Sequence, residues 1–468
     1  MKNSLKWSFI GSLASKFIGV VAFVLIARIL PPSDFGVVAI LSIIFGFTRI
    51  IVESGFKEAL IFYKIPDNGL SAIFLFLLAI SLLVVLMAVV FREDISLYFN
   101  LRDGGYLLYV IPLLVLSPFR VISIAQLESN SQFKSLAIFE LIATISSSIV
   151  GVYMAYDGLG ILSLIMLLLI NEFVRIILYY YFSSWSLSCS FSLSYLKKVF
   201  RYSYHLLFFN LVNFSTENID KIIINKSLGI ADTGLYSRAQ QISSLMPTFV
   251  SQSAGRVIFP VIASIKDKKT EVFKLHLNSL SYIILLGFPF VGLFAIYSQE
   301  FVALLIGDQW LGMVPILKIL LAMSMFQALG AISVNVYTGL GKTQMQYRVN
   351  LLLKFILLFA IILGSSYGLV ALVYGLLFAR MVNFFITQYF VCMLMRVRLH
   401  TLLLEILPVV LFILIFSFTI VQLKDWTNVD NITTLVAHSL LFVILYFSLV
   451  FFLFKRKFLS VAESFIKQ

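Results

Sequence analysis

Charged residues, cysteines and long polar segments are scarce in this 468-residue sequence. Asp, Glu, Lys and Arg together account for 12% of the chain, whereas 61% of it is hydrophobic and its mean hydropathy is +1.02. The longest break between apolar runs, around residues 183–202, has about 20 residues. No break is long enough for a water-soluble domain, so lipid is the expected solvent for most of the chain.

The chain also lacks the residue patterns of a disulfide framework, a metal site or an enzyme. The two cysteines, Cys189 and Cys392, suggest neither a disulfide nor a metal site, and the four histidines have no metal-ligand spacing. Gly341-Lys342-Thr343 looks like the end of a phosphate-binding loop, but Val336 stands where that motif requires Gly. We therefore predict no cofactor, no metal and no enzymatic activity.

The sequence instead contains about fourteen long apolar runs separated by short polar breaks. The runs are continuously apolar and do not alternate, so they predict helices and not the strands of a barrel. The sequence therefore predicts an all-α polytopic membrane protein with about fourteen transmembrane helices. The expected spans are 8–30, 35–56, 71–91, 106–126, 136–156, 159–182, 203–225, 235–262, 277–297, 313–338, 347–365, 369–392, 401–421 and 434–454.

The basic residues fall mainly on alternate breaks. With the N-terminus inside, the inner breaks hold 21 Lys and Arg residues and the outer breaks hold 6. Cytoplasmic loops of membrane proteins carry such an excess. The pattern places both termini in the cytoplasm and explains the net charge of +13 without a nucleic-acid partner.

Two short motifs indicate an internal repeat. Residues 30–36 (LPPSDFG) and 228–234 (LGIADTG) share the pattern Leu-[Pro/Gly]-x-x-Asp-x-Gly at an offset of 198 residues. Each copy follows the end of one span and precedes the next on the predicted outer face. Because six spans separate the copies, both halves have the same orientation, which predicts a parallel repeat.

Ionisable residues inside the spans are the candidate functional residues, because such groups are costly in hydrocarbon and usually face a cavity or a partner. Lys16, Arg256 and Arg380 have no obvious partner within one helical turn, so we expect these cations and Arg49 to line a water-filled, substrate-binding cavity. The acidic residues that could couple transport to an ion are Glu53, Glu217 and Asp220.

A purely structural interpretation competes with this one. Arg49–Glu53 and Glu217–Lys221 are spaced i,i+4, and Glu172–Arg175 is spaced i,i+3. Each pair could neutralise itself along one helix face.

Several stretches resemble bacterial oligosaccharide flippases of the Wzx-like polysaccharide transport family. This family belongs to the superfamily that also contains multidrug antiporters and the lipid II flippase. The stretches that carry the resemblance are residues 27–36, 126–134, 218–221, 228–229, 234–239 and 258–260. They cover mainly the first eight spans, whereas the last six match by hydropathy only.

The resemblance implies two parallel-repeat six-helix lobes, 1–200 and 201–395, around a central cavity, with two C-terminal spans appended in 396–468. It implies a substrate, an oligosaccharide on polyprenyl diphosphate, that is moved from the cytoplasmic to the outer leaflet of the bacterial inner membrane by alternating access. Membrane lipids, a glycan polymerase and export proteins are the expected partners. A multidrug–cation antiporter and the lipid II flippase remain alternatives, whereas a membrane glycan polymerase or ligase would need a large outer loop.

Overall fold

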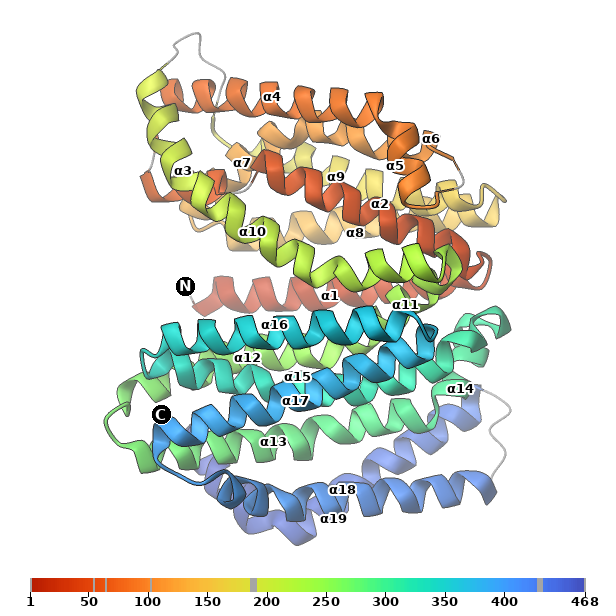
Figure 1. Cartoon of the computed structure of the whole chain (residues 1–468), viewed down its shortest axis with the longest axis vertical. Helices are drawn as coiled ribbons and strands as arrows, with labels where there is room; N and C mark the ends of the chain where they lie inside the picture. The colour runs from red at the N-terminus through yellow and green to blue at the C-terminus, as the bar shows by residue number, and fades with distance from the viewer. Residues whose placement is uncertain are drawn as a thin grey trace. The chain divides into compact units, whose positions relative to one another are not determined.

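The computed structural model describes residues 2–53, 55–63, 65–101, 103–185, 192–426 and 432–466. All regular secondary structure within these residues is helical, which confirms the predicted all-α class (Figure 1). The chain divides into two compact units, Met1–Ser237 (unit 1) and Arg238–Gln468 (unit 2). The lobe boundaries expected at residues 200 and 395 stay predictions.

The fourteen predicted spans all fall on helices, but not all are equally apolar. Eleven helical segments among the described residues are long and apolar enough to cross a membrane. The other three predicted spans lie in α1 (Lys2–Ala27), in α10 (Leu193–Ser227) and across α11 (Ile230–Ser243) and α12 (Leu245–Ser264). α10 carries polar and charged side chains along its whole length, from Lys197 and Lys198 to Lys226.

In unit 1, short helices connect some of the long helices. Gly55 has φ +82°, a left-handed conformation that ends α2 and starts α3. The elements after α1 are α2 (Pro32–Glu53), α3 (Phe56–Tyr63), α4 (Asp67–Val90), α5 (Arg92–Tyr98), α6 (Gly105–Val110), the 3-10 helix η1 (Ile111–Leu116), α7 (Ser117–Ser129), α8 (Phe133–Tyr156), α9 (Ile161–Phe182), α10 and the start of α11.

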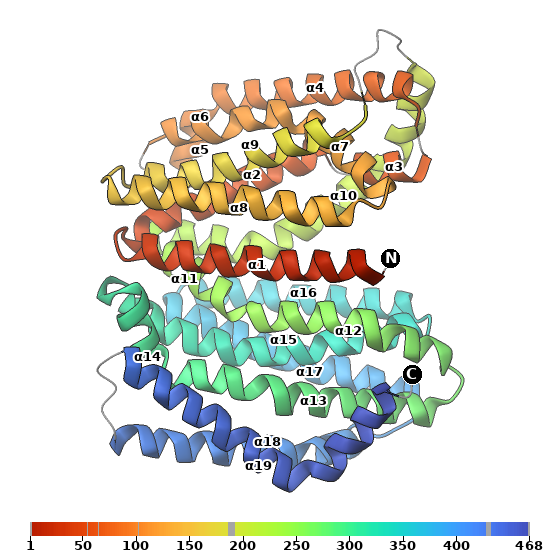
Figure 2. The same cartoon turned by 180° about the vertical axis from the view of Figure 1, so that it is seen from behind.

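Helix packing in unit 1 brings polar residues of distant segments together. α8 lies between α1 and α9, whereas α7 contacts α2, α3, α4 and α9, and α10 runs along α2, α3 and α4 (Figures 1 and 2). An aromatic cluster of Phe74, Phe119 and Trp185 holds α4 and α7 together with the segment after α9. The ends of α2, α7 and α9 thereby surround one region of the unit.

The two copies of the repeated motif touch through equivalent positions. A Cβ atom on Gly36 would lie 1.9 Å from the carbonyl oxygen of Ile230, and one on Gly234 would lie 1.9 Å from that of Pro32. Gly234 follows Gly36, and Ile230 follows Pro32, by the same 198 residues. The starts of α2 and α11 therefore cross in a reciprocal contact that only glycine allows.

Unit 2 is built around α15 (Val314–Gly339), which contacts α12, α13 and α17. α18 and α19 pack against α13, where Phe416, Phe442 and Tyr446 contribute to the core. The elements of this unit besides α12 and α15 are α13 (Lys269–Ile296), α14 (Ser298–Phe301), the π-helix η2 (Val302–Ile306), the 3-10 helix η3 (Asp308–Met313), α16 (Thr343–Ser365), α17 (Leu369–Met395), α18 (Leu399–Trp426) and α19 (Ile432–Ile466).

Candidate functional site

Unit 1 contains an ion cluster that joins α2, α7 and α9. Glu53, at the end of α2, accepts hydrogen bonds from Nε of Arg120 at 3.1 Å and from Nη2 of the same guanidinium. The Arg120 Nε also lies 3.6 Å from Oε1 of Glu172 on α9. The three side chains are only 10–12% exposed, so neither carboxylate is fully solvated by water.

Arg49 closes this cluster from the same helix as Glu53. Its Nε lies 3.3 Å from Oε2 of Glu53, and its Nη1 lies 3.2 Å from Oε1 of Glu172. The predicted i,i+4 pair is therefore confirmed, but Arg49 also reaches a second helix. With 37% of its side chain exposed, Arg49 is the most accessible cation of the cluster.

A second layer extends the cluster to α8. Arg175 lies 3.8 Å from Glu172, which confirms the predicted i,i+3 pair, and donates a hydrogen bond of 3.1 Å to Glu140. We call these six residues the buried ion cluster: Arg49, Arg120, Arg175, Glu53, Glu172 and Glu140. Its three guanidinium and three carboxylate groups give it no net charge.

A cavity of about 250 Å³ opens onto the cluster. Its polar lining includes Arg49, Glu53, Arg120, Lys57 and Asn210. Lys57 is itself paired with Glu128 of α7 at 3.3 Å. The cations of this cavity are already paired with carboxylates. An anion would therefore have to displace those carboxylates to bind there.

The other cavity cations predicted from the sequence have different surroundings. Lys16 is exposed on α1, and Arg380 is partly buried on α17 in unit 2. The side chain of Arg256 lies outside the described residues. Of the predicted cations, Arg49 lines the polar cavity of unit 1.

The three predicted coupling acids have different surroundings. Glu53 is bound by two arginines, as described above, whereas Glu217 is exposed on α10. Asp220 is buried and accepts a hydrogen bond of 2.6 Å from the hydroxyl of Tyr236. Lys221 donates to the side-chain oxygen of Asn218 at 3.3 Å.

Similarity to known proteins identifies the family. Residues 25–315 match the family described as polysaccharide biosynthesis protein. The chain belongs to this family. It is 26% identical to the succinoglycan biosynthesis transport protein ExoT of Rhizobium meliloti, over 68% of this chain and 65% of that protein. It is 22% identical to the lipopolysaccharide biosynthesis protein WzxC of Escherichia coli, over 83% of this chain and 80% of that protein.

The fold of this family member is similar to that of a solved membrane transporter. The lipid II flippase MurJ, in an inward closed conformation, aligns with a TM-score of 0.74 and 15% identity. The alignment covers 95% of this chain and 98% of that chain. At this identity the likeness concerns the fold alone.

Sequence reasoning on this family member missed the central role of Arg120. Arg120 is absent from the predicted cavity cations, but it lies on α7 with 12% of its side chain exposed. The signal was its position inside the predicted span 106–126, in a Ser-Pro-Phe-Arg segment that starts α7 after a 3-10 helix. Its partners are 67 and 52 residues away in the sequence, so spacing within one helix could not reveal them.

A second polar group, in unit 2, was also missed. His276 is fully buried, and its Nε2 lies 2.9 Å from Oε1 of Gln388. Nε2 of Gln388 donates a hydrogen bond of 2.9 Å to the hydroxyl of Ser333. These residues join α13, α15 and α17. These contacts satisfy Nε2 of His276 and the side-chain amide of Gln388, whereas Nδ1 of His276 is buried with no hydrogen-bond partner among the described residues. No cluster of potential metal ligands occurs among those residues.

Proposed function

We propose that this chain is a flippase that moves oligosaccharides linked to polyprenyl diphosphate from the cytoplasmic to the outer leaflet. The observation that carries the proposal is the family match, together with relatives named for lipopolysaccharide biosynthesis and for succinoglycan transport. A fold similar to that of a lipid flippase over 95% of the chain supports it.

The chemistry of such a substrate explains why a protein of this composition is needed. The sugar hydroxyls cannot be satisfied in hydrocarbon, and the diphosphate adds negative charge. A polar cavity lined by protein removes both obstacles, while the polyprenyl chain stays in lipid. Outward movement of about two negative charges would gain about 2.3 kcal/mol per charge for each 100 mV of inside-negative potential.

We place the chain in the bacterial inner membrane with both termini in the cytoplasm, as the charge pattern favours. Alternating access between two lobes is the proposed mechanism. A glycan polymerase and export proteins would receive the flipped substrate. No chemical step is assigned to the protein itself.

A host strain that lacks this protein provides the direct test. We expect lipid-linked oligosaccharides to accumulate on the cytoplasmic side of its membrane, and reintroduction of the gene to restore export. Loss of cell-wall precursor export instead would identify a lipid II flippase, which the fold likeness favours as the second candidate. A change in drug susceptibility alone would identify a multidrug–cation antiporter.

The cations Lys16, Arg49, Arg256 and Arg380 are the proposed contacts of the diphosphate. Each Lys→Gln or Arg→Gln change is expected to reduce export at least tenfold in membranes with normal amounts of protein. Lys342→Gln is the control, because this exposed lysine lies in a short break outside the spans. Export at the wild-type rate by all four variants would reject this set of residues.

Glu53, Glu217 and Asp220 are the proposed sites of ion coupling. Each Glu→Gln or Asp→Asn change is expected to weaken the dependence of export on an imposed proton or sodium gradient. Export that responds to the gradient as in the wild type, in all three variants, would leave membrane potential as the driving force.

A further inference from the structure

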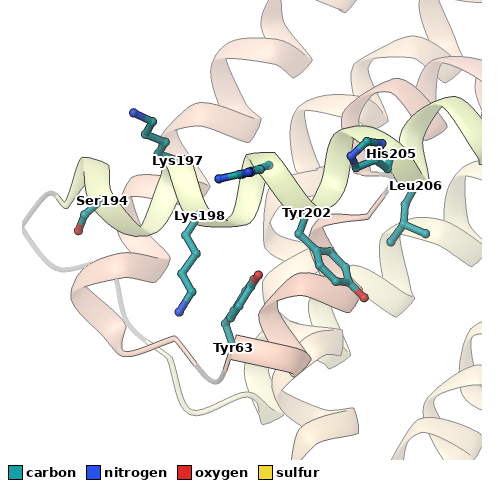
Figure 3. A pocket seen from close by; sticks show the side chains of 8 residues that line it. Tyr63, Ser194, Lys197, Lys198, Tyr202, His205 and Leu206 are labelled. Atoms are coloured by element: carbon teal, nitrogen blue, oxygen red, sulfur yellow. The ribbon is translucent and has the colours of Figure 1, made fainter.

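One face of α10 concentrates basic and aromatic side chains outside the buried ion cluster. Its residues recur every three or four positions, so they lie on one side of the helix. We call them the basic face of α10: Ser194, Lys197, Lys198, Arg201, Tyr202 and His205. Together with Tyr63 of α3 and Leu206 they line a cavity of about 890 Å³ (Figure 3).

The opposite side of α10 fixes this face in place. Val199 is fully buried in the aromatic core that α3, α4 and α7 share. Ser203 is buried against Gly55, where a Cβ atom would lie 2.7 Å from the Ser203 backbone. The helix therefore cannot rotate to hide its cations.

Unlike the cations of the buried ion cluster, the cations of this face have no carboxylate partner in the part of the chain that the structure describes. Lys197, Lys198 and Arg201 are exposed and form no ion pair with any residue that the structure describes. The described lining of the cavity contains no Asp or Glu. Three like charges within two helical turns repel one another, so an anion between them would relieve that repulsion.

Aromatic rings form the second wall of the cavity. The Lys198 ammonium lies 4.3 Å from the centre of the Tyr63 ring, and Figure 3 shows the two side chains pointing toward each other. Tyr202 packs on both Tyr63 and Phe62, with ring centres 5.9 and 5.7 Å apart. Tyrosine rings of this kind are typical of the level where lipid headgroups meet hydrocarbon.

Apolar side chains are exposed directly beside the cations. Phe62, Leu193, Phe200 and Phe208 are each 48–67% exposed. A soluble anion would not contact them, whereas a lipid would present its phosphate to the cations and its chains to these side chains. We propose that the basic face of α10 binds the phosphate group of a lipid in the leaflet where it lies, which the charge pattern predicts to be the cytoplasmic one.

A role in setting the orientation of the protein in the membrane would explain the cations of α10 but not the cavity that they line. Lysines that only fix topology need no aromatic wall and no fixed spacing. Binding at this face does not depend on the proposed transport, because it can be measured on the isolated protein without any flipping.

The test uses the full chain in detergent and native mass spectrometry with three lipids. These are a polyprenyl diphosphate, phosphatidylglycerol and net-neutral phosphatidylcholine. The variant K197Q/K198Q/R201Q removes the three cations. The matched control K266Q/K268Q/K269Q removes three exposed lysines of another predicted inner break, and K197R/K198R/R201K keeps the charge.

We expect the first variant to lose at least tenfold in affinity, about 1.4 kcal/mol, for polyprenyl diphosphate or for both anionic lipids, and to bind phosphatidylcholine as the wild type does. The two other variants should bind as the wild type does. A loss for polyprenyl diphosphate alone would identify the carrier lipid as the ligand, and a loss for both anionic lipids would identify the bulk leaflet. Wild-type affinity in K197Q/K198Q/R201Q, or an equal loss in the matched control, overturns the assignment.

Discussion

At the scale of single residues, the buried ion cluster is where the loss of one side chain should reduce the stability of unit 1 most. Three arginines and three carboxylates are balanced there across four helices. A buried ion pair adds little compared with a well-packed apolar pair, but removal of one partner leaves an uncompensated charge. Each arginine contacts two carboxylates, but Arg120 is the least exposed of the three, at 12%, so we expect its removal to cost the most.

Arg120→Met should therefore destabilise the protein by about 3–5 kcal/mol. Glu53 and Glu172, each only 10% exposed, would lose their most buried cation and keep Arg49 as the one they share. The measurement is the unfolding temperature of the purified protein in detergent.

Two further variants make this prediction specific. The double change Arg120→Met and Glu53→Gln restores equal numbers of charges, and we expect it to be more stable than Arg120→Met alone. Arg92→Met breaks an exposed pair with Glu93 and should change stability by less than about 1 kcal/mol. A similar loss in the Arg92 and Arg120 variants would contradict the assigned role.

In unit 2, Gln388 is the buried polar residue that joins two others, as Arg120 does in unit 1. Gln388→Met would leave His276 and Ser333 buried without their shared partner, at a cost of about 1–3 kcal/mol. The control is Gln344→Met, because Gln344 is exposed. Equal unfolding temperatures of these two variants would mean that the His276–Gln388–Ser333 contacts do not stabilise the unit.

At the scale of helices, the crossing of α2 and α11 depends on two glycines. Gly36→Ala and Gly234→Ala each place a methyl group 1.9 Å from a carbonyl oxygen of the other helix. Backbone atoms cannot rotate away as a side chain can, so we expect each change to cost at least about 1–3 kcal/mol. Unfolding temperature and yield of folded protein are the measurements.

Gly330→Ala is the matched control for these helix glycines. A Cβ atom there meets nothing within 4 Å, and Ala is up to about 1 kcal/mol better than Gly inside a helix. We expect this variant to be as stable as the wild type or more stable. Wild-type stability of Gly36→Ala would show that the two helices can separate at little cost.

Much at this scale could be predicted from the sequence. Continuous apolar runs with Gly and Pro at the breaks gave all fourteen helical segments, including 313–338, which carries Lys318 but forms the centre of unit 2. Hydropathy could not show that the short helix α3 starts after Gly55, or that a π-helix and a 3-10 helix precede α15. These details depend on packing between helices and not on local composition.

At the scale of the whole molecule, the excess of basic residues on alternate breaks predicts the topology. A fluorescent protein fused to the C-terminus should fold and fluoresce, because it would remain in the cytoplasm. Alkaline phosphatase fused after Asp103 should be active, since this break is predicted to face outward. The opposite pair of results would invert the orientation and move the basic face of α10 to the outer leaflet.

The sequence by itself determined the class of the protein, because hydrophobicity, loop charge and short motifs are properties of neighbouring residues. It predicted membrane-spanning helices, an internal repeat and the polysaccharide transport family. Only the tertiary structure decided which charges are neutralised. The packing of α2, α7 and α9 brings together the charges of Arg49, Glu53, Arg120 and Glu172. The burial of Val199 and Ser203 fixes the opposite side of α10, so its cations Lys197, Lys198 and Arg201 remain without carboxylate partners among the described residues. An ion pair requires its charged atoms within about 4 Å of each other in space, whereas the partners on different helices are separated by tens of residues in the chain.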